Sequence, residues 1–281
     1  MPEATIIDGL SLAAKVKEDL MKRIAAVGGR VSLDAVLVGD DQGAVLYANN
    51  QAKACAKVGI EYTLHTLPSS ATHENVMELV ERLNGDPSVT AIMVQMPLPE
   101  SVRTDDIQTL IAPHKDVEGV NPANIGNIVF GRRSLVPCTA LAVMEMIEST
   151  GVTLRGCRAV CVGASTIVGK PVAVLLMQAE ATVISTNVHT KDHDELTRGA
   201  DILISAAGVP NLIGADVVKK GAVVIDVGIN RIAGKDGKKR TVGDVDFDAV
   251  KQVAGFISPV PGGVGPMTVA MLLRNTVQAA E

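Results

Sequence analysis

Amide and phenol side chains that could position a ligand occur in two parts of the chain. Tyr47 and Gln51 lie four residues apart in a segment that predicts a helix, so their side chains share one face, one turn apart. Gln95 comes directly after the apolar run Ala91–Val94, which predicts a buried strand. A phenol and two amides can hold a ligand by hydrogen bonds, but an amide cannot shuttle protons near pH 7. Taken singly, Tyr47 and Gln51 are more often part of an amphipathic surface than of a site, and a lone Gln95 before a proline-containing run is more often a strand end.

A glycine-containing turn supplies a second kind of chemistry. Val160–Val162 predicts a short buried strand, and Gly163 follows at once, where the chain must turn tightly. Gly169 leads into the apolar segment 172–177, which predicts a helix. A strand, a glycine turn and a helix N-terminus together favour phosphate binding, because free N–H groups and the helix dipole face the anion. Only two glycines of the G-x-G-x-x-G pattern are present, so an ordinary strand–helix turn stays open as an interpretation.

The composition restricts the class of protein. The chain has 281 residues, enough for about two domains. Hydrophobic residues make up 47% and aromatic residues only 2%, so the core must be aliphatic. The net charge of −5 argues against nucleic-acid binding, and no apolar run reaches the ~18 residues of a membrane span. The N-terminus lacks the pattern of a signal peptide.

The four cysteines form no C-x-x-C pair, and the five histidines have no partners at metal-ligand spacing. We therefore expect free, buried thiols, a cytoplasmic location and no metal site.

These candidate residues must be positioned by an α/β fold. After Gly151, apolar strand segments alternate regularly with helical ones, which predicts a doubly wound, Rossmann-like parallel sheet that binds a nucleotide. The N-terminal part also alternates strands and helices. Between them we expect a polar loop over 114–126, and further on a charged hairpin-like excursion over 233–239.

Twelve short segments, taken in their order along the chain, match the sequence pattern of a known enzyme family. They are Ile7–Gly9, Val36–Gly39, Tyr47, Val94–Pro99, Lys115–Gly119, Asn124–Gly126, Pro137–Thr139, Gly163–Ser165, Val168–Pro171, Ile225–Asn230, Gly243–Val245 and Pro259–Thr268. Together they resemble the bifunctional methylenetetrahydrofolate dehydrogenase/cyclohydrolase family, nearly from end to end. The runs Val94–Pro99 and Pro259–Thr268 are the most specific.

The resemblance implies an NAD(P)-dependent enzyme of two α/β domains. Residues 1–138 plus 259–281 would form the folate-binding catalytic domain, and residues 139–258 the NAD(P)-binding Rossmann-like domain. It also implies a cytoplasmic homodimer in one-carbon metabolism and purine biosynthesis, with tetrahydrofolate derivatives as substrates. Such enzymes oxidise 5,10-methylenetetrahydrofolate to the methenyl form and hydrolyse that product to 10-formyltetrahydrofolate.

The resemblance also implies the roles of individual residues. Catalytic roles would fall to Tyr47, Gln51, Gln95 and Glu118, the last accepting hydrogen bonds from the pterin edge. Folate contacts would come from Tyr47, Gln95, Glu118, Pro261, Gly262, Gly263 and Val264. The cofactor would contact Gly163, Ala164, Ser165, Val168, Gly169, His189, Thr190 and Ile229.

Gln51 departs from the family pattern, in which a lysine follows the tyrosine by four residues. Oxidation needs mainly positioning of two rings, whereas hydrolysis needs a titratable group near the reacting carbon. Lys53 and Lys57 lie about 240° and about 280° around the helix from Tyr47, so neither replaces that lysine easily. Glu118 stands where the family usually has aspartate. We therefore expect a dehydrogenase whose cyclohydrolase activity is weak or lost.

Three alternatives stay open. The chain could be fully bifunctional, or a non-catalytic folate- or nucleotide-binding relative, or another two-domain dehydrogenase such as one acting on shikimate. The last needs a Lys/Asp pair that we cannot place.

For the cofactor, Ala164 is shared with some NADP-using relatives, while Asn187–Thr190 lacks both the usual serine and an acidic residue typical of NAD use. We expect NADP, by a small margin over NAD.

Overall fold

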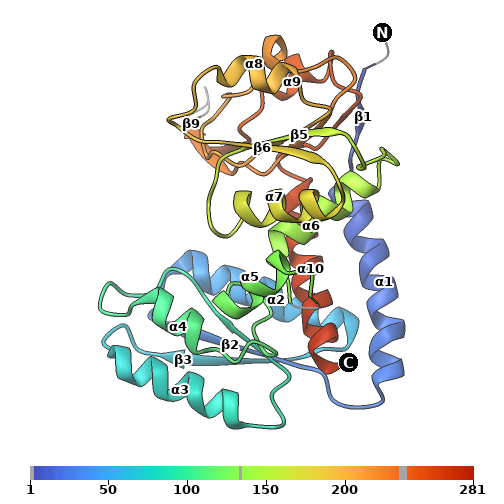
Figure 1. The fold of residues 1–281 in the computed structure, drawn as a ribbon. Helices are drawn as coiled ribbons and strands as arrows, with labels where there is room; N and C mark the ends of the chain where they lie inside the picture. Colours follow the sequence, from blue (N-terminus) through green and yellow to red (C-terminus); the bar gives the residue numbers. More distant parts are fainter. Residues whose placement is uncertain (1–2, 133–134, 234–238) are drawn as a thin grey trace. The chain divides into compact units, whose positions relative to one another are not determined.

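The computed structural model describes residues 3–132, 135–233 and 239–281 and is drawn in Figure 1. The chain divides into two compact units. The first, the six-stranded unit, comprises Met1–Ala13 and Thr139–Thr268, and the second, the three-stranded unit, comprises Ala14–Cys138 and Val269–Glu281. Both combine parallel strands with helices, which confirms the predicted α/β class.

The six-stranded unit is built on one parallel sheet. Its strands are β1 (Thr5–Ile6), β5 (Arg158–Val162), β6 (Thr182–Thr186), β7 (Ile202–Ser205), β8 (Val223–Asp226) and β11 (Phe256–Ile257), in the order β1-β11-β8-β7-β5-β6. The chain passes from β5 outward to β6 and then returns to β7 on the other side of β5. The carboxyl ends of β5 and β7 therefore flank a topological switch point, where open α/β sheets bind ligands.

Short helices and a two-stranded ribbon complete this unit. They are α6 (Cys138–Glu148), α7 (Gly169–Gln178), α8 (His193–Arg198), the 3-10 helix η1 (Ala215–Val217), α9 (Phe247–Val250) and the antiparallel pair β9 (Asn230–Ala233) and β10 (Lys239–Val242). The pairing of β9 with β10 agrees with the predicted hairpin, whose residues 234–238 lie outside the described residues. The core is aliphatic, as the composition predicts, with residues such as Val160, Leu203 and Val224 fully buried.

The three-stranded unit holds a small parallel sheet in the order β3-β2-β4. Its strands are β2 (Ser32–Val38), β3 (Glu61–Leu67) and β4 (Ala91–Val94), and its helices are α2 (Gln42–Val58), α3 (His73–Gly85), α4 (Thr104–Leu110) and α5 (Pro122–Val129). Two longer helices, α1 (Gly9–Val27) and α10 (Val264–Ala280), begin in one unit by sequence and end in the other.

Alternation along these strands gives the small sheet two different faces. Val36, Ile92 and Val94 share one face and pack in an aliphatic cluster with α3. Tyr62 and Met93 belong to the opposite face, because their register partners are Leu33 and Ala35. That second face is the one that meets the polar side chains of α2.

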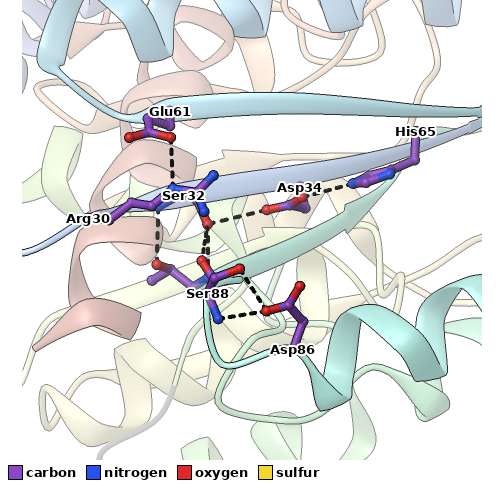
Figure 2. A network of polar contacts seen from close by, with 8 residues as sticks. Arg30, Ser32, Asp34, Glu61, His65, Asp86 and Ser88 are labelled. Carbon is purple, nitrogen blue, oxygen red and sulfur yellow. Dashed lines mark hydrogen bonds and ion pairs between the residues drawn. The ribbon is translucent and has the colours of Figure 1, made fainter.

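A polar network ties together the strands on the α3 face (Figure 2). The buried Asp34 carboxylate contacts His65 Nε2 at 2.8 Å and accepts from Ser32 Oγ at 3.2 Å. Ser32 and Thr90 exchange hydrogen bonds between backbone N–H and side-chain oxygen, at 3.1 and 3.0 Å. Because these bonds join β2 to the residue before β4, they fix the register of the sheet that carries Gln95.

Two sequence expectations differ from the structure. The segment 121–126, predicted as part of a polar loop, contains helix α5: the Asn121 side chain caps it by accepting from Ala123 N at 2.8 Å, and Pro122 occupies its first turn. Residues 1–13 and 259–268, predicted to belong with the folate domain, group with the six-stranded unit, because β1 pairs with β11 (Thr5 with Phe256).

All four cysteines are free and buried, as expected. Within 3–132, 135–233 and 239–281, no helix has the length and apolarity to cross a membrane, and no group of three His, Cys, Asp or Glu could hold a metal ion.

Candidate active site

Two buried amides form the centre of a polar cluster in the three-stranded unit. Gln51 and Gln95 are each 1% exposed, and Gln95 Nε2 donates to Gln51 Oε1 at 2.6 Å. Gln51 Nε2 in turn donates to Met93 Sδ at 3.1 Å, and the Tyr62 hydroxyl approaches Gln51 Oε1 at 3.5 Å. The amide cluster (Gln51, Gln95, Met93 and Tyr62) therefore holds Gln51 in one orientation, with its oxygen accepting and its nitrogen donating.

Tyr47 lies at the margin of the amide cluster and is 39% exposed. Burial of the phenol raises its pKa, the Glu118 charge raises it further, and a hydrogen bond with Gln51 opposes them. Tyr47 is therefore a neutral phenol that touches Gln51 and lies within electrostatic range of Glu118. The four residues predicted to be catalytic thus gather in one unit, from α2, the end of β4 and the 115–119 loop.

Glu118 is the titratable member of this group. Burial, followed by the nearby Asp116 charge, raises the pKa of its carboxyl to about 8, although a hydrogen bond from the Val94 backbone opposes the shift. A carboxyl group with such a pKa is mostly protonated at pH 7 in the unliganded protein. It becomes a paired acceptor when it loses its proton or meets a ligand that donates two N–H groups.

The loop that carries Glu118 is held rigidly from two sides. The Asp116 carboxylate accepts from Gly119 N at 3.1 Å, Asn121 N at 2.7 Å and Asn124 Nδ2 at 2.9 Å. Gly119 has φ +68°, and a Cβ there would lie 2.3 Å from the Val136 backbone. No residue but glycine fits this position, so the loop backbone packs directly on the segment before α6.

Asn275 of α10 holds the same loop from the other side. Its Nδ2 donates to the carbonyl oxygens of Val117 and Val136, each at 2.8 Å, and the residue is completely buried. The Cys138 thiol also donates to Val117 O, at 3.2 Å. Glu118 therefore follows a carbonyl group whose position is fixed by two side chains.

Within the described residues, the hydrogen bonds of the amide cluster include none with Lys53, Lys57 or Lys115. Lys53 and Lys57 of α2 are exposed, whereas Gln51 on the same helix is buried. Lys115 is buried, but its ammonium donates to three carbonyl oxygens, those of Leu83, Asn84 and Asp86, at 2.7–3.0 Å. Across the described part of the chain, none of the hydrogen bonds of the amide cluster involves a lysine.

Sequence analysis missed three residues that shape this region: Tyr62, Met93 and Asn275. For the first two a signal existed, since strand alternation places both on the sheet face that α2 covers. For Asn275 no local signal existed, because its partner Val117 is 158 residues away in the chain.

The second candidate site is a cavity of about 530 Å³ in the six-stranded unit. It lies at the switch point, since its walls come from the turn after β5 and the segments that follow β6 and β7. Its lining residues are Val162, Gly163, Ala164, Ser165, Thr186, Asn187, Val188, Thr190, His193, Ala206, Ala207, Val209 and Leu212. This size and place suit one part of a dinucleotide.

The predicted cofactor residues divide into two groups. Gly163, Ala164, Ser165 and Thr190 line the cavity. The other four, Val168, Gly169, His189 and Ile229, are not among its lining residues. His189 and Ile229 are exposed, and Ser165 Oγ accepts from Val168 N and Gly169 N, each at 3.3 Å, at the start of α7.

The phosphate-type turn depends on two close backbone approaches. Gly163 has φ +102°, and a Cβ there would lie 2.3 Å from Ala206 O. A Cβ on Gly169 would lie 1.9 Å from Gly163 O. The two glycines that the sequence singled out therefore let the first turn of α7 close on the end of β5.

We predict that Gly169→Ala weakens NADPH binding at least tenfold and destabilises the protein by about 1–3 kcal/mol, the usual cost of overpacking. The added methyl group must push α7 away from the Gly163 turn. Fluorescence titration with NADPH and thermal unfolding measure the two effects. Gly126→Ala is the control, because this helical glycine has open space around it. Equal behaviour of the two variants would contradict the prediction.

The segment Pro261–Val264 belongs to the six-stranded unit. Gly262 has φ +106°, and a Cβ on Gly263 would lie 2.5 Å from Pro259 O. Gly9 packs against the same turn, since its Cβ would lie 1.9 Å from Gly263 O. The turn is therefore a compact backbone structure that presents main-chain groups rather than long side chains.

Together these features define a class of α/β protein that has a switch-point cavity suited to a nucleotide cofactor and a separate cluster of uncharged hydrogen-bonding groups near one carboxyl group. The family model for the tetrahydrofolate dehydrogenase/cyclohydrolase catalytic domain matches residues 7–118, and the model for the NAD(P)-binding domain of that family matches residues 137–281. The chain belongs to the tetrahydrofolate dehydrogenase/cyclohydrolase family.

Sequence relatives and solved structures support the same family assignment. A bifunctional protein FolD from Bordetella avium is 48% identical, over 99% of this chain and 98% of its own length. The crystal structure of a bifunctional methylenetetrahydrofolate dehydrogenase/cyclohydrolase from Campylobacter jejuni has a TM-score of 0.94 and 43% identity, over 99% of this chain and 98% of the other. A Trypanosoma brucei enzyme complexed with NADP cofactor and an inhibitor has a TM-score of 0.92 and 38% identity, over 100% and 98%.

These findings confirm the family resemblance, the two-part α/β fold and an NAD(P)-dependent dehydrogenase. They do not show that cyclohydrolase activity is weak or lost. The relatives carry the name bifunctional, which favours the alternative of full bifunctionality over that expectation.

Proposed function

We propose that the chain catalyses both reactions for which its relatives are named: oxidation of 5,10-methylenetetrahydrofolate to the methenyl form, then hydrolysis to 10-formyltetrahydrofolate. The observation that carries the proposal is the full-length identity of 48% to a bifunctional relative, together with the gathering of Tyr47, Gln51, Gln95 and Glu118 in one unit. In this proposal the hydrolysis is the slower reaction, for the reason given below.

The oxidation requires that the folate and nicotinamide rings be positioned correctly, and it does not require a protein group that transfers a proton. A nicotinamide cofactor would supply the hydride acceptor, and the residues that line the switch-point cavity, among them Gly163, Ala164 and Ser165, would hold part of that cofactor. Tyr47 and Gln95 orient the folate near its one-carbon bridge, and the Glu118 carboxylate accepts N–H groups from the pterin. Folate contacts of Gly262, Gly263 and Val264 stay a prediction that rests on the family. None of these roles requires a charged group beside the reacting carbon.

The hydrolysis asks for a group that can take a proton from the attacking water. Gln51 cannot, because its side chain is an amide, which accepts a hydrogen bond from Gln95 and donates one to Met93. Tyr47, whose pKa is raised by burial, stays a protonated phenol at pH 7 and is therefore a poor proton acceptor. A dehydrogenase without useful hydrolase activity is therefore the second candidate, and the buried amide at position 51 is the observation that favours it.

We propose NADP as the preferred cofactor. The segment after β6, Asn187–Thr190, lines the cavity in part and contains no acidic residue that would repel a 2′-phosphate. Asn187 N donates to Thr190 Oγ1 and His189 N to Asn187 Oδ1, each at 2.9 Å, so the segment forms an ordered turn. Homodimer formation, a cytoplasmic location and a place in purine biosynthesis stay predictions that rest on the family.

One experiment tests these proposals together. Purified protein is given methylenetetrahydrofolate with NADP or NAD at equal concentration, and methenyl and formyl products are followed separately. We expect methenyl product to form faster with NADP and then to disappear slowly, but above the spontaneous rate. Methenyl product that persists at the spontaneous rate would favour the second candidate, and no oxidation with either cofactor would overturn the proposed function.

A further inference from the structure

The cofactor cavity is supported by a carboxylate that none of the roles above includes. Asp244 follows β10 and is completely buried. Its Oδ2 accepts from Ala207 N at 2.8 Å, Gly208 N at 3.0 Å and Ser205 Oγ at 3.2 Å. Its Oδ1 accepts from Asn230 Nδ2 at 2.9 Å. Four donors thus surround one carboxylate, so its negative charge is fully engaged within the six-stranded unit.

Asp244 is itself held by a second buried carboxylate, Asp226, at the end of β8. Asp226 accepts from Asp244 N at 3.0 Å, Val245 N at 2.9 Å and Gly228 N at 2.9 Å. The space between the two segments is filled, because a Cβ on Gly243 would lie 1.8 Å from Asp226 Oδ2. The backbone at Asp244 therefore has one position, fixed from the end of the neighbouring strand.

One of the donors that Asp244 binds, Ala207 N, belongs to a residue in a wall of the cavity. Ala206 and Ala207 line it, and Ala206 N donates to Val162 O at 2.7 Å. Ala206 O in turn is the atom against which Gly163 packs without room for a Cβ. The loop after β7 is thus fixed by Asp244 on one side and meets the phosphate-type turn on the other.

We propose that Asp244 is a positioning residue for the nicotinamide cofactor. By binding two successive backbone N–H groups, at Ala207 and Gly208, it holds the loop after β7 in the conformation that forms the cavity wall beside Gly163. Asp244 does not line the cavity, so it acts on the cofactor through the loop. This inference rests on the proposed function, because it assumes that the cavity takes NADP(H).

The test uses a reciprocal exchange of side chains. Asp244→Asn keeps one oxygen for Ala207 and Gly208 but turns an NH₂ group toward the NH₂ group of Asn230. In the single variant Asn230→Asp, the new carboxylate faces the carboxylate of Asp244. The double variant Asp244→Asn/Asn230→Asp again places one donor opposite one acceptor, with their positions exchanged. Asp201→Asn is the control: Asp201 accepts from Arg158 N at 2.8 Å, at the amino ends of the strands of this sheet.

NADPH binding is measured by fluorescence titration, and KM and kcat by methenyl formation. We expect Asp244→Asn to raise the Kd for NADPH and the KM for NADP about tenfold, as for a lost charge-assisted bond, with kcat and the folate KM changed less than about twofold. The double variant should recover most of the affinity, and Asp201→Asn should bind as the wild type does. Such recovery would not follow from general destabilisation, because both substitutions are retained.

Three results would overturn the inference. The first is a folded Asp244→Asn variant that binds NADPH as tightly as the wild type does, and the second is a double variant that binds NADPH as weakly as the single variants. The third is a KM for folate that rises as much as the KM for NADP. If Asp244→Asn does not fold, Asn230→Ala takes its place, with an expected rise in Kd of about threefold, and an unchanged Kd would count against the inference. Wild-type protein that binds neither NADPH nor NADH would overturn the proposed function, and the inference with it.

Discussion

Gln51→Lys is expected to accelerate hydrolysis of 5,10-methenyltetrahydrofolate about a hundredfold, at the lower end of what a positioned acid–base group contributes. The oxidation rate should change by only a few-fold, because that step depends on ring positioning. The reason is local: position 51 is buried next to Gln95 and Met93, and an amide there offers no titratable proton. Following loss of the methenyl absorption in the presence and absence of NADP separates the two reactions.

Two matched variants make this result interpretable. Gln51→Met removes the amide without adding a charge, so it should not accelerate hydrolysis. Lys53→Gln removes an exposed ammonium from the same helix and should leave both activities as they are. If wild-type protein already hydrolyses the methenyl compound rapidly and Gln51→Lys adds nothing, the second step does not depend on a charged group at position 51.

Glu118→Gln is expected to change how stability depends on pH. In the folded protein, burial raises the pKa of the Glu118 carboxyl from its ordinary value of 4.5 to about 8. The folded state therefore holds this proton more tightly than the unfolded state does. The stabilisation from this group is complete below pH 4.5 and is lost as pH rises through 8. Because the amide cannot ionise, the variant should gain stability relative to the wild type by roughly 1 kcal/mol per pH unit over this range.

Urea unfolding of both proteins at several pH values between 4.5 and 9 measures this difference. Glu78→Gln serves as the control, since Glu78 is exposed on α3 and the substitution removes the same charge without burial. Its stability curve should run parallel to that of the wild type. Parallel curves for Glu118→Gln as well would show that the Glu118 carboxyl is not desolvated.

Local patterns predicted much of the fold. β4 begins and ends at the predicted residues, and Gln95 stands directly after it, because a short apolar run depends only on neighbouring residues. Helix α5 was missed: its polar residues indicated a loop, although Asn121 and Pro122 form a start signal for a helix. That signal was present in the sequence and was outweighed by composition.

The candidate sites were predictable only in part, because their support comes from distant segments. Tyr47 and Gln95 could be named from order and type, but the contact between Gln51 and Met93 needs the register of β2 with β4. The carboxylate of Asp244 reaches Ala207 across 37 residues, and no periodic pattern connects them. Side chains that support a site in this way become visible only when the strands are assembled.

The aromatic residues of this chain give it a built-in spectroscopic reporter. It contains no tryptophan, and its only two tyrosines are Tyr47 and Tyr62. Both interact with Gln51, one at the margin of the amide cluster and one within it. The ultraviolet absorption and fluorescence of the tyrosine phenol groups therefore come from residues that lie next to Gln51. Changes in tyrosine fluorescence should report on the surroundings of this amide without an added label.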